Sequence, residues 1–254
     1  MKKYVCLVIS FIATLTLCCI PLLGSAASSV QSTENPIYHY RVQDDNTVCL
    51  TYADDSQFDG LWVVPETLDG YTVSDVTYIP YSVDSVVLPS GVKELHGYVY
   101  WASRVLRELH LPEGLERIEW YVANLQDSVV IPSSVTYISE KAFGWTSAPT
   151  PSGQTTVVGP ALVPVENFTV YSFGNDVAKA YAEADGHLYV DLNAFDRGDL
   201  DANGTINMMD ALTLYAMSSG EDYGSPLERA MADCTGDGEI GMMDTLKIYY
   251  IAAG

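Results

Sequence analysis

Three stretches in the middle of the chain repeat one pattern of apolar and polar positions. LPSGVKEL begins at Leu88, LPEGLERI at Leu111 and IPSSVTYI at Ile131. Each reads apolar, Pro, two small or polar residues, apolar, two polar residues, apolar, and the starts lie 23 and 20 residues apart. A repeat of that length predicts a solenoid in which each unit contributes a short strand and a turn, and buries its apolar face against its neighbours.

The segment before these repeats predicts a cap for the solenoid. Residues 38–42 and 47–52 have the composition of strands and are separated by an Asp-Asp-Asn sequence. Because an open solenoid end would expose its core, we interpret residues 28–57 as a capping hairpin. The solenoid then occupies residues 58–192. Its pattern is interrupted at 146–164, where Pro, Thr, Ser and Gly without periodicity predict an irregular loop.

The repeats resemble the bacterial BspA-like leucine-rich repeats. The resemblance includes the DGYTV segment from Asp69 to Val73 and the closing stretch from Phe168 to Leu192. It implies a terminal turn, helix and strand, with the helix at Val177–Ala184. The family pattern has Ala-Phe followed by Gly-Cys, and here only KAFG at residues 141–144 comes close. We therefore expect remodelled turns in the two preceding units, which read YVYWAS and WYVANL.

Near the C-terminus, oxygen-bearing side chains recur at the spacing of a calcium loop. DLDANGTINMMD has Gly204 at position 6 for the sharp turn and Ile206 at position 8, directed toward the core. Calcium takes six to eight oxygen ligands, so such a loop presents alternate side chains to one ion and adds the backbone carbonyl of position 7. The predicted ligands are Asp199, Asp201, Asn203, Thr205, Asn207 and Asp210.

Thirty-four residues later the pattern returns as DCTGDGEIGMMD. This second loop has Thr at position 3 and offers no side chain at position 9, where Gly241 stands. We expect two calcium ions, with the second held more weakly. The predicted ligands of the second ion are Asp233, Thr235, Asp237, Glu239 and Asp244.

Each loop is followed by a segment with apolar residues at helical spacing, MMDALTLYAM and MMDTLKIYYI. The duplicated loops, the following helices and an Asp at position 12, where an ordinary EF-hand has Glu, resemble a dockerin at residues 196–254. The resemblance implies that the partner is a cohesin of a scaffold protein, contacted by loop positions 10 and 11 and the helix after them. The implied contact residues are Met208, Met209, Tyr215, Met242, Met243 and Tyr249.

Four methionines on a surface would form an adaptable apolar contact, because thioether side chains are flexible and polarizable. We therefore expect the cohesin to present an apolar face. The alternative is that one Met of each pair packs beneath its own loop.

The first residues have the pattern of an export signal. Two lysines precede an apolar run from Val5 to Leu23, and small residues follow at 24–27. We interpret residues 1–27 as a signal peptide. The mature protein should then be secreted and extracellular, associated with a scaffold or cell surface, and free of membrane contact.

Charge and cysteine content narrow the possible partners. The chain has 33 acidic and 12 basic residues, a net charge of −21, which argues against nucleic acid and anionic lipid as ligands. Three of the five cysteines lie in the signal peptide, leaving Cys49 and Cys234. That is too few for a disulfide framework, so packed cores and metal must supply the stability.

The sequence does not predict a catalytic centre. The histidines lie in different units without a recognised nucleophile beside them, and His110 should occupy an exposed strand position. The repeats leave no room for a catalytic barrel. A glycoside hydrolase with a pair of acids on the repeat surface remains the enzymatic alternative. The four histidines are His39, His96, His110 and His187.

Large aromatic residues cluster at the unit turns, where small or apolar residues are usual. Flat rings stack on sugar faces or fill protein interfaces, and packing in the core is the other interpretation. The candidates for binding a glycan or a second protein are Tyr98, Tyr100, Trp101, Trp120, Tyr121 and Trp145.

Together these patterns predict an α+β chain: a short-strand leucine-rich-repeat solenoid followed by a small α-helical dockerin with two EF-hand-like calcium loops. The predicted function is a cellulosome-type component that docks to a cohesin and presents a non-catalytic binding module, serving polysaccharide degradation. The alternatives are a polysaccharide-degrading enzyme of the same system and a protein-binding regulator or adhesin with no role in sugar binding.

Overall fold

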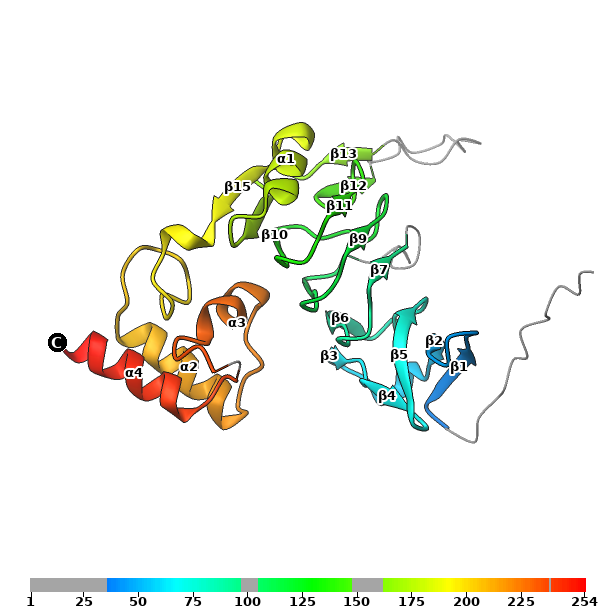
Figure 1. The fold of residues 1–254 in the computed structure, drawn as a ribbon, viewed down its shortest axis with the longest axis horizontal. Coiled ribbons are helices and arrows are strands. Elements are labelled where there is room, and N and C mark those ends of the chain that lie inside the picture. The colour runs from blue at the N-terminus through cyan, green and yellow to red at the C-terminus, as the bar shows by residue number, and fades with distance from the viewer. Residues whose placement is uncertain (1–35, 97–104, 148–161, 238) are drawn as a thin grey trace, which may run out of the picture.

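The computed structural model describes residues 36–96, 105–147, 162–237 and 239–254. The expected signal peptide, the YVYWAS turn and most of the predicted loop at 146–164 lie outside these residues. Short strands build the first part of the described chain and helices the last part (Figure 1). The elements are β1 (Tyr38–Val42), β2 (Val48–Ala53), β3 (Gly60–Val63), β4 (Thr67–Leu68), β5 (Tyr71–Val76), β6 (Val83–Val87), β7 (Glu94–Leu95), β8 (Glu108–His110), β9 (Arg117–Ile118), β10 (Ser128–Ile131), β11 (Tyr137–Ile138), β12 (Trp145–Ser147), β13 (Leu162–Pro164), β14 (Thr169–Ser172), α1 (Asp176–Asp185), β15 (Leu188–Asp191), α2 (Met208–Ser219), α3 (Pro226–Ala232) and α4 (Met242–Ala253).

Repeat units contribute two short strands each, where the sequence predicts one. The first strand ends just before the proline of the repeated sequence pattern. The second strand ends at the last apolar residue of that pattern. The units therefore build two separate parallel sheets, β3-β6-β8 and β7-β9-β11. Between them, the apolar side chains of Val92 and Leu115 are completely buried. The predicted fold class, a short-strand solenoid followed by a small helical unit, is confirmed.

The proline of the repeated sequence pattern begins the same turn in each unit. The carbonyl oxygen of Pro89 accepts a hydrogen bond from the amide of Val92 at 3.1 Å, and the next two units repeat this bond at 3.2 and 3.3 Å. Proline lacks an amide N–H and has a fixed φ, so it can sit between two strands without leaving a donor unsatisfied. The turn carries the chain from one sheet of the solenoid to the other.

Both ends of the solenoid are covered. At the N-terminal end β1 and β2 pair antiparallel, and β2 pairs in parallel with β5, so the hairpin extends the array. At the other end lies α1, one residue longer at each end than the expected Val177–Ala184. The side chain of Asn175 accepts the amide N–H of Val177 and donates to the carbonyl oxygens of Pro132 and Val135. One residue thus caps the helix and ties it to the last repeat.

The C-terminal helices form a second core that touches the solenoid. Helices α2 and α4 pack against each other, and Leu214, Met217 and Ile248 are buried in this core. Val130 and Tyr171, from β10 and β14 of the solenoid, pack against the same core. The helical unit therefore lies on the sheet β10-β14-β15 (Figure 1). Among the described residues, the structure contains no helix with the length and apolar character needed to cross a bilayer.

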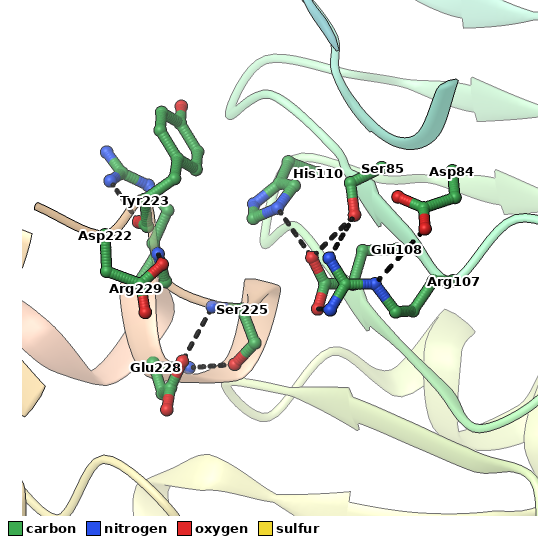
Figure 2. A network of polar contacts seen from close by, with 11 residues as sticks. Asp84, Ser85, Arg107, Glu108, His110, Asp222, Tyr223, Ser225, Glu228 and Arg229 are labelled. Atoms are coloured by element: carbon green, nitrogen blue, oxygen red, sulfur yellow. Dashed lines mark hydrogen bonds and ion pairs between the residues drawn. The ribbon is translucent and has the colours of Figure 1, made fainter. Parts of the chain in front are cut away.

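His110 is buried, so the expectation of an exposed strand position is wrong. Only 8% of its surface is accessible, and Tyr223, in the segment before α3, contacts it edge to face with ring centroids 5.2 Å apart (Figure 2). The Nε2 atom of His110 lies 3.9 Å from Oε2 of Glu108, which is longer than a hydrogen bond. The alternation of apolar and polar residues around His110 could not indicate that a residue of the C-terminal unit would cover its side chain.

Two contacts between a cation and a ring support this junction. The guanidinium of Arg229 lies 4.1 Å from the ring centroid of Tyr223 and also donates a hydrogen bond to that residue's carbonyl oxygen at 3.0 Å. The guanidinium of Arg197 lies 3.9 Å from the ring centroid of Phe173, on the solenoid. Helix α3 packs against β8 and β10, leaving a cavity of about 260 Å³ beside His110. The junction is therefore a defined surface and not a bare linker.

We predict that Tyr223→Ala loosens the two units from each other. The substitution removes the ring that covers His110, an edge-to-face contact that stabilises the junction by about 0.5–1.5 kcal/mol. The radius of gyration from small-angle X-ray scattering should rise. The matched control is Tyr137→Ala, which removes an Arg117 contact of 4.3 Å that lies wholly within the solenoid. Equal scattering from the two variants would contradict the prediction.

Candidate metal centre and exposed helix face

The first predicted calcium loop brings three carboxylates together. Oxygen atoms of Asp199, Asp201 and Asp210 lie within 4.8 Å of one another. Asp199 and Asp210 are buried and Asp201 is exposed, so the cluster opens to solvent on one side. Like charges this close repel one another until a cation neutralises them. A hard cation with a preference for oxygen ligands, such as calcium, fits this donor set.

Backbone amides arrange the loop around Asp199. Its two carboxylate oxygens accept hydrogen bonds from the amide of Asn203 at 3.1 Å and the amide of Gly204 at 2.7 Å. Gly204, at position 6, has a φ of +90°, a conformation that glycine adopts without strain. Burial raises the pKa of the Asp199 carboxyl, and the neighbouring Asp201 acts in the same direction. A cation bound beside Asp199 would act against both effects by favouring the charged carboxylate.

Asp210 connects the loop to the helix that follows. One of its oxygens accepts the amide N–H of Leu200 at 2.9 Å and the other accepts that of Asn207 at 2.8 Å. The side chain of Asn207 accepts the amide of Met209 and so caps α2. Of the predicted ligands, Asn203 and Thr205 are exposed, and the Oδ1 of Asn203 accepts the amide of Thr205 at 2.9 Å. The side-chain amide of Asn203 also donates a hydrogen bond to the carboxylate of Asp201 at 2.7 Å.

The second loop has the same connection to its helix but a different interior. Asp244 accepts the amides of Cys234 at 3.1 Å and Gly241 at 2.9 Å, matching the two amide bonds of Asp210. Asp244 also accepts the hydroxyl of Thr235 at 2.9 Å. Burial alone would raise the pKa of the Asp244 carboxyl, but the hydrogen bonds, led by that of Gly241, lower it overall. In the second loop, therefore, two predicted ligands, Thr235 at position 3 and Asp244 at position 12, are hydrogen-bonded to each other.

The remaining predicted ligands of the second loop are spread apart. Asp233 accepts the amide of Gly236 at 2.7 Å, Asp237 accepts that of Glu239 at 3.0 Å, and both Asp237 and Glu239 are exposed. In the part of the chain that the structure describes, the first loop alone forms a cluster of three acids. Cys234, which sequence reasoning did not assign a role, donates its thiol to the carbonyl oxygen of Asp244 at 3.5 Å.

The helices after the loops expose matching rows of apolar side chains. The two rows face solvent with 41 to 67% of each residue exposed, so no Met of either pair packs beneath its loop. Each residue of the second row stands 34 positions after its counterpart in the first. The first row is Met208, Met209, Leu212 and Tyr215, and the second is Met242, Met243, Leu246 and Tyr249. Sequence reasoning named the methionines and tyrosines but missed the leucines, although their spacing of 34 residues was visible.

Three of the six aromatic candidates on the solenoid fall within the described residues. Tyr98, Tyr100 and Trp101 lie outside the described residues. Tyr121 is only 8% exposed, so its proposed ligand role fails, because its ring face is covered by the protein.

The two remaining candidates are held by contacts within the solenoid. Trp120 is half-buried and its ring lies 5.5 Å from that of Tyr121. Trp145 donates its indole N–H to Asp185 at 2.9 Å, beneath α1. Both rings therefore take part in contacts within the solenoid.

Comparison with known proteins identifies the helical unit. Residues 197–249 match the family model described as Dockerin type I domain. The C-terminal unit is a dockerin type I domain. Dockerin domains bind calcium and dock onto cohesins in cellulosome-like assemblies, which are typically extracellular.

The comparisons add little for the solenoid. A crystal structure of a leucine-rich repeat protein from T. pallidum is 22% identical with a TM-score of 0.34, and the match covers 44% of this chain and 66% of that one. No curated protein matches.

We predict that the two loops of the dockerin bind calcium unequally. Asp199→Asn removes one charge from the clustered acids and should lower calcium affinity at least about tenfold. Asp233→Asn should have a smaller effect, because Asp233 lies outside such a cluster. Isothermal titration calorimetry of the two variants measures the difference. Equal losses of calcium affinity, or a larger loss from Asp233→Asn, would contradict the predicted ranking of the two loops.

A second prediction concerns position 9 of the second loop. Gly241 has φ −143° and ψ −176°, close to the −137° and −177° of Asn207, and a Cβ there would meet no atom within 4 Å. Gly241→Asn should therefore add a helix cap and an oxygen donor without strain. We expect higher calcium affinity at the second loop and about 0.5–1 kcal/mol more stability without calcium. The reciprocal variant, Asn207→Gly, should weaken the first loop, and thermal melts with and without calcium test both.

Proposed function

We propose that this protein is a secreted component of a polysaccharide-degrading assembly, which docks to a scaffold cohesin and presents its solenoid as a non-catalytic binding module. The observation that carries the proposal is the pair of exposed apolar rows on α2 and α4 of a dockerin domain. Soluble surfaces rarely expose a contiguous set of large apolar residues without a partner to cover it. Each of the two helices exposes four such residues in one row.

Calcium would control this surface through the loop geometry. Met208 and Met209 stand at positions 10 and 11 of the first loop, between the metal cluster and the body of α2. Asp210 joins the loop amides to the first turn of that helix. Binding of calcium to a site that exists only in the folded state stabilises that state. Loss of calcium should therefore disorder the loop and displace the methionines that begin each row.

The chemistry of the two rows favours an apolar partner surface. Methionine side chains adapt to different shapes, and tyrosine provides a ring with a polar edge. Each row also lacks a charged side chain at the positions that repeat. The proposed cohesin contact residues are therefore the six named from the sequence, with Leu212 and Leu246 added.

Two of the solenoid's histidines, His110 and His187, are buried in packing contacts. His110 lies beneath Tyr223, and His187 is buried next to Phe143, whose carbonyl oxygen lies 3.2 Å from its Nε2 atom. Burial lowers the pKa of His187, which favours the neutral form. These two side chains serve packing within the solenoid and at the junction. Release of reducing sugar from polysaccharides incubated with the purified protein would support the enzymatic alternative.

We predict that Met208→Asp combined with Met242→Asp abolishes cohesin binding. A carboxylate in each row would lose its hydration against an apolar partner, and the expected loss is at least about a hundredfold, or 2.7 kcal/mol or more. Calorimetry against a panel of purified cohesin modules measures it. Val105→Asp, a comparably exposed apolar residue on the solenoid, is the matched control. Chelation of calcium should abolish binding by the parent protein, and binding that survives both changes would exclude this face.

A further inference from the structure

Aromatic rings from β1, β2 and the segment after β5 pack in tilted contacts at the N-terminal end of the solenoid. The ring centroids of His39 and Tyr52 are 5.0 Å apart, and those of Tyr52 and Tyr78 are 5.1 Å apart. His39 lies opposite Tyr52 in the register of β1 and β2. The parallel register of β2 and β5 pairs residue 50 with residue 76, which carries Tyr52 beside Tyr78 just after the end of β5. Strand register therefore aligns residues that are far apart in the sequence.

A fourth aromatic residue, Tyr81, stands on the same fixed loop as Tyr78. Tyr81 follows Tyr78 by three residues, and the carboxylate of Asp55 accepts both the hydroxyl of Tyr78, at 2.8 Å, and the amide of Tyr81. The hydroxyl of Ser82 donates to the carbonyl oxygen of Asp55 at 2.9 Å. The segment that carries the last two rings is thus held at three points. A surface ordered before binding loses less conformational entropy when a ligand arrives.

The rings are exposed and retain unused polar groups. Tyr81 is 55% exposed and Tyr52 37%, His39 is also exposed, and Tyr78 is half-buried. Within the described residues, the hydroxyls of Tyr52 and Tyr81 make no hydrogen bond. Each of these tyrosines therefore presents an apolar ring and a free donor at its edge.

This combination points to one class of ligand. The C–H faces of neutral sugars stack on aromatic rings, and their hydroxyl groups pair with phenol and carboxylate oxygens. The net charge of −21, with Asp54 and Asp55 beside the row, disfavours anionic polymers. A row one ring wide suits a linear chain better than a protein, whose specific interfaces need a broad patch. We propose that His39, Tyr52, Tyr78 and Tyr81 form a stacking row for a neutral polysaccharide chain.

The site deepens the proposed function, on which it rests for the role of the solenoid as a binding module. It differs from the aromatic candidates of the sequence, which lie at the unit turns. β1 and β2 lie at the end of the molecule far from α2 and α4 (Figure 1). A glycan on the row would therefore leave the cohesin-facing helices open, and both partners could bind one chain together.

The test uses the full chain with calcium and four neutral probes: insoluble cellulose, and soluble xyloglucan, galactomannan and mixed-linkage β-glucan. Affinity electrophoresis and a pull-down on cellulose should show binding of at least one, and no binding to polygalacturonate. Tyr52→Ala and Tyr81→Ala should each weaken that binding at least about tenfold. Tyr81→Phe, which keeps the ring, should retain most of it.

Tyr137→Ala provides the matched control, because Tyr137 is 39% exposed on a different sheet and its loss should leave glycan binding unchanged. Thermal melts establish that each variant is folded, and cohesin affinity, measured in parallel, should be the same in all of them. Failure of all four probes to bind, or binding that is insensitive to Tyr52→Ala and Tyr81→Ala, would overturn the proposal. The proposal would also be overturned if Tyr52 and Tyr81 were needed to bind a protein and not a glycan. Intact cohesin binding in that case would leave the docking function standing.

Discussion

An array of parallel strands that simply stops exposes its core and leaves the backbone groups of its last strand unpaired, which is unfavourable. The solenoid meets this constraint differently at its two ends. A hairpin extends the sheet at the N-terminal end, and the β2–β5 register that attaches it also aligns the exposed rings. At the C-terminal end, α1 and β15 close the array, and the dockerin covers part of the adjoining sheet. Both surfaces with a candidate role in binding are therefore built on the ends of the solenoid.

Within the dockerin, the aspartate at position 12 has a structural role that does not depend on metal. Asp210 and Asp244 each accept the amides of loop positions 2 and 9, so both loops keep the same attachment to their helices. The loops differ in what surrounds that attachment. In the first, two further carboxylates face Asp210, whereas in the second a threonine hydroxyl is bonded to Asp244. The duplication thus preserves the position of the helices while the metal-binding interiors diverge.

Sequence periodicity predicted those features that depend on neighbouring residues. The spacing of Pro and apolar positions predicted the solenoid, and alternate oxygen donors predicted the loop in which Asp199, Asp201 and Asp210 meet. Features that depend on distant residues were missed. His110 is buried by Tyr223, more than a hundred positions later, and Tyr52 meets Tyr78 only through strand register. A chain pattern indicates which way a side chain points but not what lies against it.

The contacts of Tyr223 and Arg197 with the solenoid also determine how a docked protein would be oriented. With a flexible linker, the solenoid would sample many orientations relative to the dockerin, and its effective concentration near any one ligand would be low. A fixed junction holds the solenoid in one orientation relative to the dockerin. Neighbouring copies on one scaffold would then point the same way relative to their cohesins. Such an array would favour ligands that are themselves extended and ordered, since several sites could engage one surface at once without reorienting.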